Sequence, residues 1–389
     1  MGSGENLRPS EPGRFTTTHG QASTVARRWG SRWTEWGCAT AAPVQTGGVA
    51  SSVSSPISSP SSGSAPTSEV LVVGAGIAGL LAAVELQRAG FTVRVIDKGR
   101  GVGGRLASRR IGDAIFDHGA PCLDLQGGRL PDHWWRERLG PAQTEWWPAT
   151  AGSEVVVPCR WRGAPTMASV AKHLAQGLEV LSETALTFLR TEGSQWIAST
   201  SGGSVFSAGA VVLTPPAPQS LALLDTGAVD LPPDLRARLA AIEYDRCLAV
   251  MAVLDEPSSR IPFPGGLSPV SGPLAWISDN QAKGISSVPA VTLHATAAFS
   301  LEHWDRDRTE SGLLLIEAAR EWIGPRVREF QVHGWRYSRP RILDASPCVV
   351  ASLRPPLVLA GDAFGPGGIE GAALSGLAAA RAILEASPV

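Results

Sequence analysis

The fold is decided by the stretch Glu69–Asp97, which reads EVLVVGAGIAGLLAAVELQRAGFTVRVID. EVLVV is a short apolar run rich in β-branched residues, and GAGIAG is a glycine turn. IAGLLAAVELQRAG has a helical pattern that ends at Gly90, and TVRVID has the pattern of a second strand. A strand, a helix and a second strand in this order form a βαβ unit, which requires a parallel sheet. We therefore expect an α/β fold of the Rossmann type.

Gly74, Gly76 and Gly79 follow the spacing GxGxxG inside this unit. The first glycine permits a tight turn, the second lets the backbone approach a pyrophosphate, and the third lets helix and strand pack closely. The phosphates then lie at a helix N-terminus. Asp97, at the end of the second strand, can bind a ribose hydroxyl. This context predicts a bound dinucleotide rather than a glycine turn without a ligand.

A basic, glycine-rich loop follows directly, DKGRGVGGRLASRR from Asp97 to Arg110. Its glycines allow it to fold back over the dinucleotide, where Arg100 or Arg105 could meet the phosphates. Arg105 stands beside two glycines and is the better candidate. Arg109 and Arg110 fall on a hairpin-like run and are predicted at the surface.

Composition excludes several function classes. The chain has 389 residues, a formal net charge of -1, 43% hydrophobic and 18% charged residues, which is typical of a soluble globular protein with two or more domains. This balance gives no reason to expect nucleic acid or an anionic membrane surface as a partner. The five cysteines lack metal-ligand spacing and fit inert thiols in a reducing compartment. With no apolar run of membrane-spanning length and no apolar signal-peptide core, we expect a cytoplasmic protein with no metal site.

The region before the βαβ unit has a different character. Residues 51–68 are rich in serine and proline and read as a flexible linker. Residues 1–50 are interpreted as a disordered tail or the product of a wrongly chosen start codon, with a transit peptide as the alternative.

Later segments predict helices at Met167–Gln176, Ser311–Ile323 and Gly368–Ala386. Strands are predicted at Leu178–Phe188, Gln195–Thr200, Arg246–Leu254, Val288–Phe299 and Gln331–Ser338. Two further strands are predicted in AVVLTPPAPQ, where the prolines end the strand, and in PPLVLAGDAF.

Eight motifs together resemble a known family. Besides GAGIAG they are RGVGGRLASRR with FDHGA, WRGAPTMASVAKHLA, LTPPAPQ, WISDNQAKG, LHATAAFS, HGWRYSRP and GDAFGPGGIEGAALSG, in this order. They resemble the flavin-dependent amine oxidase superfamily and, within it, the renalase family. The resemblance covers essentially Glu69–Ser387.

The resemblance implies FAD, held in a glutathione-reductase-type FAD-binding Rossmann domain of residues 69–120, 156–240 and 330–389. An inserted α+β substrate domain, with a mixed or antiparallel sheet, would comprise residues 121–155 and 241–329. Asp97 would bind the adenosine ribose, and Asp362 the ribityl chain or a phosphate. The helix that opens at Gly368 would direct its N–H groups at the flavin pyrimidine edge. The implied cofactor-binding residues are Gly74, Gly76, Ile77, Ala78, Gly79, Asp97, Lys98, Gly104, Arg105, Gly119, Ala120, Asp362, Gly368 and Ile369.

HGWRYSRP alternates so that His333, Trp335 and Tyr337 share one face of a strand. From the residues alone, core packing explains these aromatic side chains as well as substrate stacking does. A lone histidine on an apolar strand, such as His294, is also more often a core residue than a catalyst. The resemblance makes His294, Trp335 and Tyr337 the candidates for contact with a small-molecule substrate.

The resemblance also implies a reaction. A dihydropyridine nucleotide, such as the 2- or 6-dihydro isomer of NAD(P), would pass a hydride to flavin N5, and dioxygen would reoxidise the flavin to yield hydrogen peroxide. None of the three lysines, Lys98, Lys172 and Lys283, is an obvious counterpart of the flavin-adjacent lysine of monoamine and polyamine oxidases. A dihydropyridine needs no general base because hydride loss makes its ring aromatic.

The sequence departs from the family pattern at Pro121–Leu123, Ala363, Phe364 and Gly368, positions expected near the flavin. Two alternatives therefore remain. One is an amine oxidase, or a desaturase or isomerase, acting on a larger apolar substrate. The other is a flavin-binding protein without turnover. The sequence does not identify the oligomeric state.

Overall fold

The structure, a computed structural model, describes residues 39–40, 67–124, 129–146, 159–258, 260–269 and 271–386. The described residues belong to one compact unit. The predicted N-terminal extension over residues 1–68 lies outside the described residues, apart from 39–40 and 67–68.

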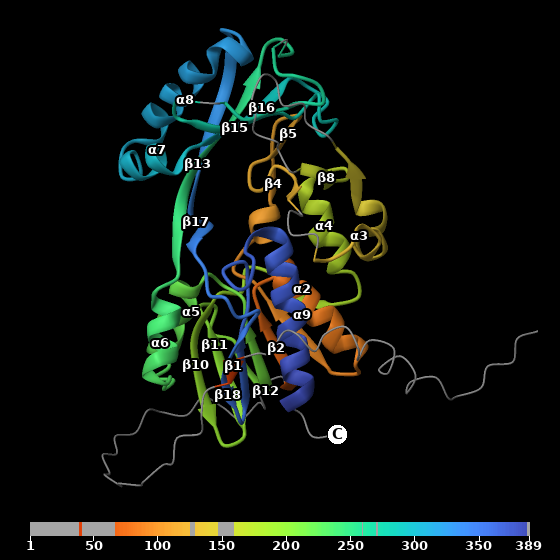
Figure 1. Cartoon of the computed structure of the whole chain (residues 1–389), viewed down its shortest axis with the longest axis vertical. Coiled ribbons are helices and arrows are strands. Elements are labelled where there is room, and N and C mark those ends of the chain that lie inside the picture. The colour runs from red at the N-terminus through yellow and green to blue at the C-terminus, as the bar shows by residue number, and fades with distance from the viewer. Residues whose placement is uncertain are drawn as a thin grey trace, which may run out of the picture. The chain divides into compact units, whose positions relative to one another are not determined.

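The larger sheet contains the βαβ unit and, within the described residues, has nine strands (Figure 1). Its order is β1-β18-β19-β12-β2-β3-β9, and a hairpin of β10 and β11 attaches to β12. Strands β19, β12, β2, β3 and β9 run parallel, with Val72 opposite both Val212 and Val95. The strands are β1 (Ala39–Thr40), β2 (Thr67–Val73), β3 (Val93–Ile96), β9 (Glu179–Leu181), β10 (Leu186–Glu192), β11 (Gln195–Thr200), β12 (Val205–Leu213), β18 (Val349–Leu353) and β19 (Pro356–Leu359). The predicted parallel sheet is confirmed.

Helix α2 (Ile77–Arg88) and helix α9 (Gly368–Ala386) pack side by side next to this sheet (Figure 1). They approach closely because Gly376 lies against the Ala78 carbonyl, where a side chain would have no room. Gly79 lies in the same way against the carbonyl of Gly74. The third glycine of the turn therefore serves close packing, as its position in the motif predicts.

The second sheet is antiparallel, in the order β14-β15-β16-β13-β17. Its strands are β14 (Gly266–Leu267), β15 (Leu274–Asp279), β16 (Ala290–Ala295), β13 (Glu243–Leu254) and β17 (Val327–Ile342). Helices α7 (Ala297–Glu302) and α8 (Arg308–Ile323) lie on one face, where Leu248 and Leu293 pack with Leu315. On the other face, Met251 packs with Phe116 of the hairpin β4 (Ser108–Ile111) and β5 (Ala114–Asp117). The hairpin therefore joins the glycine loop to the second sheet.

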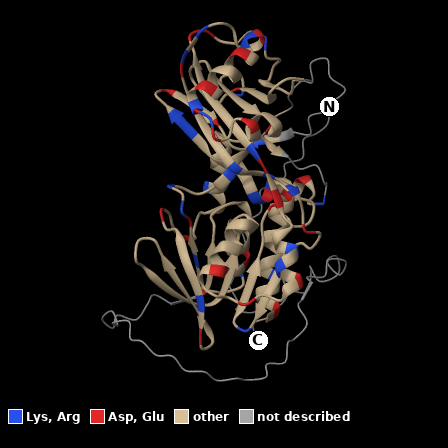
Figure 2. Ribbon diagram, turned by 90° about the vertical axis from the view of Figure 1, so that its left-hand side faces the viewer, with Lys and Arg blue, Asp and Glu red and all other residues tan. Residues whose placement is uncertain are grey.

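The remaining elements surround these sheets. They are the strands β6 (Leu123–Asp124), β7 (Gln143–Glu145) and β8 (Cys159–Gly163), the helices α3 (Asp132–Leu139), α4 (Met167–Leu174), α5 (Ala217–Thr226) and α6 (Pro233–Ala240), and the 3-10 turns Gly104–Leu106 and Gly140–Ala142. Basic and acidic residues are interspersed along the chain (Figure 2). Strand β17 pairs with β13 and so belongs to the second sheet. The division of the chain into an FAD-binding domain and a substrate domain stays a prediction.

Several predicted elements end or divide differently in the structure. The strand predicted to reach Phe299 stops at Ala295, because the Thr296 hydroxyl accepts a hydrogen bond from Phe299 N (3.3 Å) and caps α7. The run Leu178–Phe188 divides into β9 and β10 around Glu183, which has a φ of 54°. The prolines after β12 begin helix α5, where a proline in the first turn costs no helical hydrogen bond.

The expectation that all five cysteines are thiols is wrong for one of them. Cys247 and Cys348 are buried and lie outside any disulfide. Cys122 is disulfide-bonded. Sequence spacing could not show this because cysteines pair according to their distance in the folded chain.

Candidate active site

The glycine turn leaves free backbone N–H groups at the N-terminus of α2. Gly74 has a φ of 105°, which favours glycine, and Gly76 is an N-cap residue with no side-chain cap on the helix. A Cβ at Gly76 would meet no heavy atom within 4 Å. Ile77 and Ala78 follow as buried residues of α2. The open space above Gly76, at the positive end of the helix, fits the pyrophosphate of a dinucleotide such as FAD.

Asp97 holds this turn from the end of β3. Its Oδ2 accepts a hydrogen bond from Ala75 N (2.7 Å), and its Oδ1 accepts one from Gly99 N (2.6 Å). Each oxygen has a further lone pair, which can accept from a ribose hydroxyl. The neighbouring Lys98 is exposed, and its Nζ donates to Gln219 Oε1 (3.3 Å).

The basic loop folds back over the glycine turn. Gly103 N donates to Ala75 O (2.8 Å), and a Cβ at Gly104 would lie 3.8 Å from Gly76 Cα. Gly104 has a φ of 53°, so glycine is favoured there. Of the arginines predicted at the surface, Arg110 is exposed and Arg109 is half-buried. The loop therefore lies where it would cover a dinucleotide on the turn.

Arg105 and Asp362 form a bidentate ion pair, with Nη1 and Nη2 at 2.5 and 2.6 Å from the two carboxylate oxygens. Arg105 Nη1 also lies within 3.3 Å of the carbonyl oxygens of Tyr337 and Ser338. Burial by itself would lower the pKa of Arg105, but the Asp362 carboxylate more than offsets this and raises it. The structure thus joins two of the predicted cofactor residues, although they are far apart in sequence.

The N-terminus of α9 provides a second open helix end. Gly368 has a φ of 66°, and a Cβ there would meet no heavy atom within 4 Å. Ile369 follows it in the first turn. Because Gly376 contacts Ala78 at the start of α2, the α9 terminus lies about 12 Å further along the α9 axis, at about 1.5 Å per residue. Two free helix ends separated in this way fit an extended dinucleotide.

The segment Asp117–Pro121 begins at the last residue of β5 and meets the second sheet through the carbonyl oxygen of His118. This oxygen accepts hydrogen bonds from Trp335 Nε1 (2.8 Å) and lies 3.1 Å from His294 Nε2. The His118 and Trp335 rings stack with centroids 5.4 Å apart. The His333 ring lies edge-on to both, at 5.1 Å from His118 and 4.3 Å from Trp335. Two of the predicted substrate residues, His294 and Trp335, thus meet at one backbone carbonyl.

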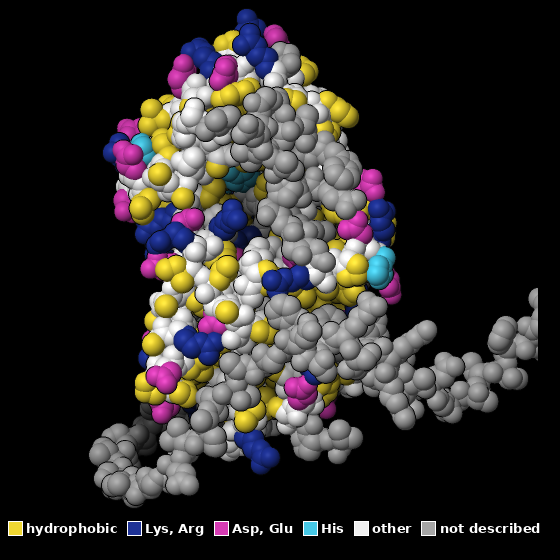
Figure 3. All heavy atoms as spheres, viewed as in Figure 1, with side chains coloured by type: hydrophobic (Ala, Val, Ile, Leu, Met, Phe, Trp, Pro, Cys, Tyr) yellow, Lys and Arg dark blue, Asp and Glu magenta, His cyan; other side chains and the backbone are white. Residues whose placement is uncertain are grey.

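His294 and His333 lie on the same face of the second sheet. Ala249 of β13 is directly opposite both His294 of β16 and His333 of β17, and Trp276 of β15 is opposite His294. The small side chain of Ala249 leaves room between the two imidazoles. Figure 3 shows histidine surface in a hollow below the part of the molecule drawn at the top.

The imidazoles of this cluster are neutral at pH 7. Burial, together with smaller contributions from nearby His333 and Arg109, lowers the pKa of His118 to about 3. Burial also lowers the pKa of His294 to about 4, against the opposing effect of the His118 carbonyl. The pKa of His333 is lowered by burial and by positive charges including Arg109. The cluster therefore presents uncharged rings.

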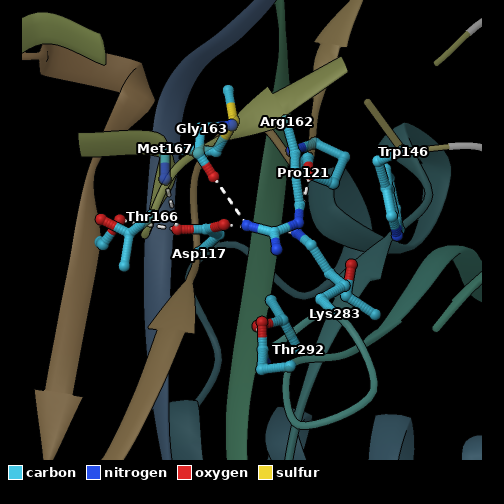
Figure 4. Close-up of polar contacts among 12 residues, drawn as sticks. Asp117, Pro121, Trp146, Arg162, Gly163, Thr166, Met167, Lys283 and Thr292 are labelled. Carbon is cyan, nitrogen blue, oxygen red and sulfur yellow. Dashed lines mark hydrogen bonds and ion pairs between the residues drawn. The ribbon is translucent and has the colours of Figure 1, made fainter. Parts of the chain in front are cut away.

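Lys283 was missed by the sequence analysis as a residue of this region. Its side chain is fully buried, and its Nζ donates to Pro121 O (2.7 Å) and lies 3.3 Å from Asp117 Oδ2 (Figure 4). Nζ also lies 4.9 Å from the centroid of the Trp146 ring. Burial lowers the pKa of Lys283, and the Asp117 carboxylate opposes this effect. Lys283 therefore binds both ends of the segment that carries the His118 carbonyl.

Asp117 is the centre of these buried polar contacts. Its Oδ1 accepts hydrogen bonds from Ser108 Oγ (2.6 Å) and Met167 N (3.0 Å). The Arg162 guanidinium points toward Asp117, and its Nη1 donates to Gly163 O (2.8 Å; Figure 4). A signal for Lys283 was present in the sequence: an aspartate inside the apolar strand AIFD requires a buried cation or donor.

The remaining predicted residues lie beside Arg105. The Tyr337 ring packs edge-on against Tyr244, with centroids 5.5 Å apart. A register shift in the β13–β17 pairing between Trp335 and Arg339 interrupts the alternation that was expected to align Tyr337 with Trp335. Ala120 N donates to Arg105 O (2.8 Å), and Gly119 packs so closely on that carbonyl that no side chain would fit. Tyr337 is therefore separate from the histidine cluster.

Comparison with known sequences gives two matching families. The NAD(P)-binding Rossmann-like domain matches residues 72–136, and the flavin containing amine oxidoreductase family matches residues 137–384. Renalase of Mus musculus is 26% identical over 340 residues, which is 81% of this chain and 98% of renalase. The match to mouse renalase therefore extends over nearly the whole of that protein.

Solved structures agree at the level of the fold. Putrescine oxidase bound to putrescine aligns with a TM-score of 0.60 at 14% identity, over 82% of this chain and 99% of that chain. A putative protoporphyrinogen oxidase from Exiguobacterium sp. 255-15 aligns with a TM-score of 0.61 at 13% identity, over 83% of this chain and 99% of that chain.

Within the described part of the chain, every helix is too short or too polar to cross a membrane. The same residues hold no group of three or more His, Cys, Asp or Glu side chains arranged to bind a metal ion. The sequence matches, together with two open helix ends that fit a dinucleotide, identify an FAD-dependent oxidoreductase. The chain belongs to the flavin containing amine oxidoreductase family.

Proposed function

We propose that this enzyme oxidises a dihydropyridine nucleotide, such as the 2- or 6-dihydro isomer of NAD(P), by hydride transfer. The observation that carries the proposal is the cluster of His118, His294, His333 and Trp335, whose imidazoles are neutral. A flat dihydropyridine can pack against such rings. Its oxidation requires no general base because the ring becomes aromatic when hydride leaves. The resemblance to the renalase family favours the same substrate.

FAD is proposed to lie along the residues predicted from the sequence. Gly74, Gly76 and the first residues of α2 would hold the pyrophosphate, Asp97 the adenosine ribose, and the N-terminus of α9 the flavin ring. When bound, FAD supplies a hydride acceptor at N5, and its reoxidation by dioxygen yields hydrogen peroxide. The protein's part is to orient the dihydropyridine and exclude water.

The charges near the cluster support an uncharged ring as substrate. The Lys283 and Arg109 cations each act on a histidine of the cluster and lower its pKa. The Asp117 carboxylate compensates the charge of Lys283, so it is the Arg109 charge that would oppose the entry of a protonated amine. This argues for a dihydropyridine over an ammonium substrate.

One observation favours a second candidate, amine oxidation. Lys283 is buried directly behind Pro121, next to Gly119 and Ala120, which are predicted to contact the flavin. Amine oxidases of this superfamily carry a flavin-adjacent lysine, for which the sequence offered no obvious counterpart. The two candidates therefore have to be separated by experiment.

The test is anaerobic mixing of the FAD-loaded enzyme with 2- and 6-dihydro-NAD(P), and separately with putrescine and a panel of monoamines. We expect the dihydropyridines to bleach the flavin absorbance and the amines to leave it unchanged. Admission of dioxygen should then restore the absorbance with one hydrogen peroxide per flavin. Bleaching by an amine alone would refute the proposal in favour of the second candidate.

A further inference from the structure

His294 has one ring nitrogen with a hydrogen-bond partner and one without. Its Nε2 lies 3.1 Å from the carbonyl oxygen of His118. A carbonyl oxygen can only accept, so Nε2 carries the ring proton. The pKa of His294, lowered to about 4 by burial, leaves a single proton on the ring at pH 7. Nδ1 therefore carries a lone pair and can only accept a hydrogen bond.

This acceptor is unsatisfied. His294 is only 8% exposed, and its Nδ1 is buried without a hydrogen-bond partner among the described residues. His118 Nδ1 is buried and unpartnered in the same part of the chain. Buried polar atoms in native proteins are almost always paired with protein, water or ligand, because an unpaired one is costly. Two such atoms in one aromatic cluster indicate that a ligand with a hydrogen-bond donor belongs there.

The chemistry of Nδ1 restricts that ligand. Oxidised flavin N5 and the flavin carbonyl oxygens are acceptors and cannot pair with a lone pair. The N3–H of the flavin is a donor, but it lies on the pyrimidine edge, which is proposed to face the N-terminus of α9 rather than His294. In a dihydropyridine nucleotide, the ring nitrogen is substituted by ribose, and the carboxamide on the ring carries the N–H groups nearest to the reacting carbon. We propose that His294 Nδ1 accepts a hydrogen bond from this carboxamide N–H and thereby selects carboxamide-bearing pyridine nucleotides. The inference rests on the proposed function and specifies the substrate group that is recognised.

The His118 carbonyl keeps His294 in the tautomer that can accept a hydrogen bond at Nδ1. It holds the proton of His294 on Nε2, and Trp335 Nε1 binds the same oxygen (2.8 Å). Without that carbonyl, the proton could move to Nδ1, which would then repel a donor N–H. Lys283 in turn binds Pro121 O and Asp117 on either side of His118. His294 is thus the specificity residue, and the segment Asp117–Pro121 sets its tautomer.

Two variants of His294 separate its two nitrogens. A glutamine side chain reaches the position of Nε2, so His294→Gln keeps a donor for the His118 carbonyl and loses the acceptor. An asparagine places its carbonyl oxygen near the position of Nδ1, so His294→Asn keeps the acceptor and loses the donor. Each holoenzyme is titrated with NAD and with its 3-acetylpyridine analogue, in which a methyl ketone replaces the carboxamide, and flavin difference spectra give the dissociation constants. The dihydro forms of both nucleotides are then mixed anaerobically with each enzyme.

We expect the wild type to bind NAD about tenfold to a hundredfold more tightly than the acetyl analogue, the range for a buried acceptor left unpaired. His294→Gln should lose this preference, whereas His294→Asn should keep it with weaker binding of both nucleotides. Each comparison is the ratio of the values that the two nucleotides give with one enzyme. An intrinsic difference between the carboxamide ring and the acetyl ring affects every enzyme equally and therefore cancels when the ratios of the variants are compared. If the variants fail to retain FAD, the wild-type ratio alone decides.

The outcomes distinguish the inference from the proposed function. If dihydro-NAD bleaches the wild-type flavin but the two nucleotides bind equally, the carboxamide bond is refuted and the proposed function stands. A carboxamide preference that survives in His294→Gln also overturns the assignment to Nδ1. If neither dihydropyridine bleaches the flavin and neither nucleotide perturbs its spectrum, the proposed function itself fails.

Discussion

Replacing Lys283 by methionine removes one half of the buried pair with Asp117 and roughly preserves side-chain length. Both side chains are 0% exposed, and their charged atoms lie 3.3 Å apart. At an effective dielectric constant of about 20, two unit charges at this distance attract by about 5 kcal/mol. Breaking a buried pair at one end costs about 3 to 5 kcal/mol, because the remaining charge stays in the interior without its partner.

The hydrogen bonds that Asp117 keeps decide where the loss in unfolding free energy falls within this range. After Lys283→Met, Asp117 keeps hydrogen bonds from Ser108 Oγ and Met167 N, so we expect a loss in unfolding free energy of about 3 kcal/mol. Asp117→Asn should cost at least as much, because it leaves the Lys283 ammonium with Pro121 O and the Trp146 ring. The double variant removes both charges and should lose less than the sum of the two single losses, by about 3 kcal/mol.

Denaturant unfolding of the holoenzyme measures these losses, with tryptophan fluorescence as the signal and the same saturating FAD concentration throughout. The exposed pair Arg320–Glu317, with side chains 57% and 69% exposed, supplies the control, and Arg320→Met should change stability by less than about 0.5 kcal/mol. Losses that add within about 0.5 kcal/mol in the double variant would refute the coupling. So would a Lys283→Met loss no larger than that of Arg320→Met.

Three further predictions concern the cofactor and the histidines. Gly76→Ala should fold normally, since its Cβ meets nothing within 4 Å, yet bind FAD at least about tenfold more weakly by filling the proposed pyrophosphate space; unchanged FAD affinity in an ultrafiltration assay would contradict this placement. Asp362→Asn breaks the bidentate pair with Arg105 and should lower the flavin-to-protein absorbance ratio of purified enzyme, and a wild-type ratio would count against a cofactor role. The folded pKa of His294, about 4, lies below the unfolded value of about 6.5, so its contribution to stability is lost as pH falls between these values, by about 1.4 kcal/mol per pH unit. His294→Gln does not titrate and should lose stability less steeply than wild type between pH 6.5 and 4.5 in urea titrations; equal slopes would show that His294 is not buried as a neutral ring.

Local patterns in the sequence predicted most of the elements but placed their ends less well. The run Gln195–Thr200 predicts a strand with the bounds of β11, because its alternation and its flanking turns are local. The strand predicted through Val288–Phe299 is too long because apolar residues continue past Ala295, and only the hydroxyl of Thr296 ends the strand. Alternation likewise aligned Tyr337 with Trp335, and the register shift against β13 separates them. A register shift depends on the partner strand, which the alternation of one strand does not reveal.

Some parts of the candidate site depend on residues that are close in the sequence, and other parts depend on residues that only the fold brings together. The glycine turn and Asp97 are recognised from sequence because their chemistry depends on residues that are close in the chain. Lys283, in a glycine-flanked turn of the sequence, was no obvious counterpart of a flavin-adjacent lysine, whereas in the fold it lies against Asp117, which is 166 positions away. His294 and Trp335 were candidates for substrate contact, but the fold commits one N–H of each to the His118 carbonyl.

The sequence by itself determined the βαβ unit, the glycine turn and the family, because strand and helix periodicity and the glycine spacing are properties of neighbouring residues. Only the tertiary structure decided what surrounds the His118 carbonyl and which nitrogen of His294 is free. Those facts depend on side chains from β16 and β17 and from the segment after β5 meeting at a single oxygen atom. Such a meeting is set by strand register and by the packing of buried charges, which no stretch of neighbouring residues encodes alone.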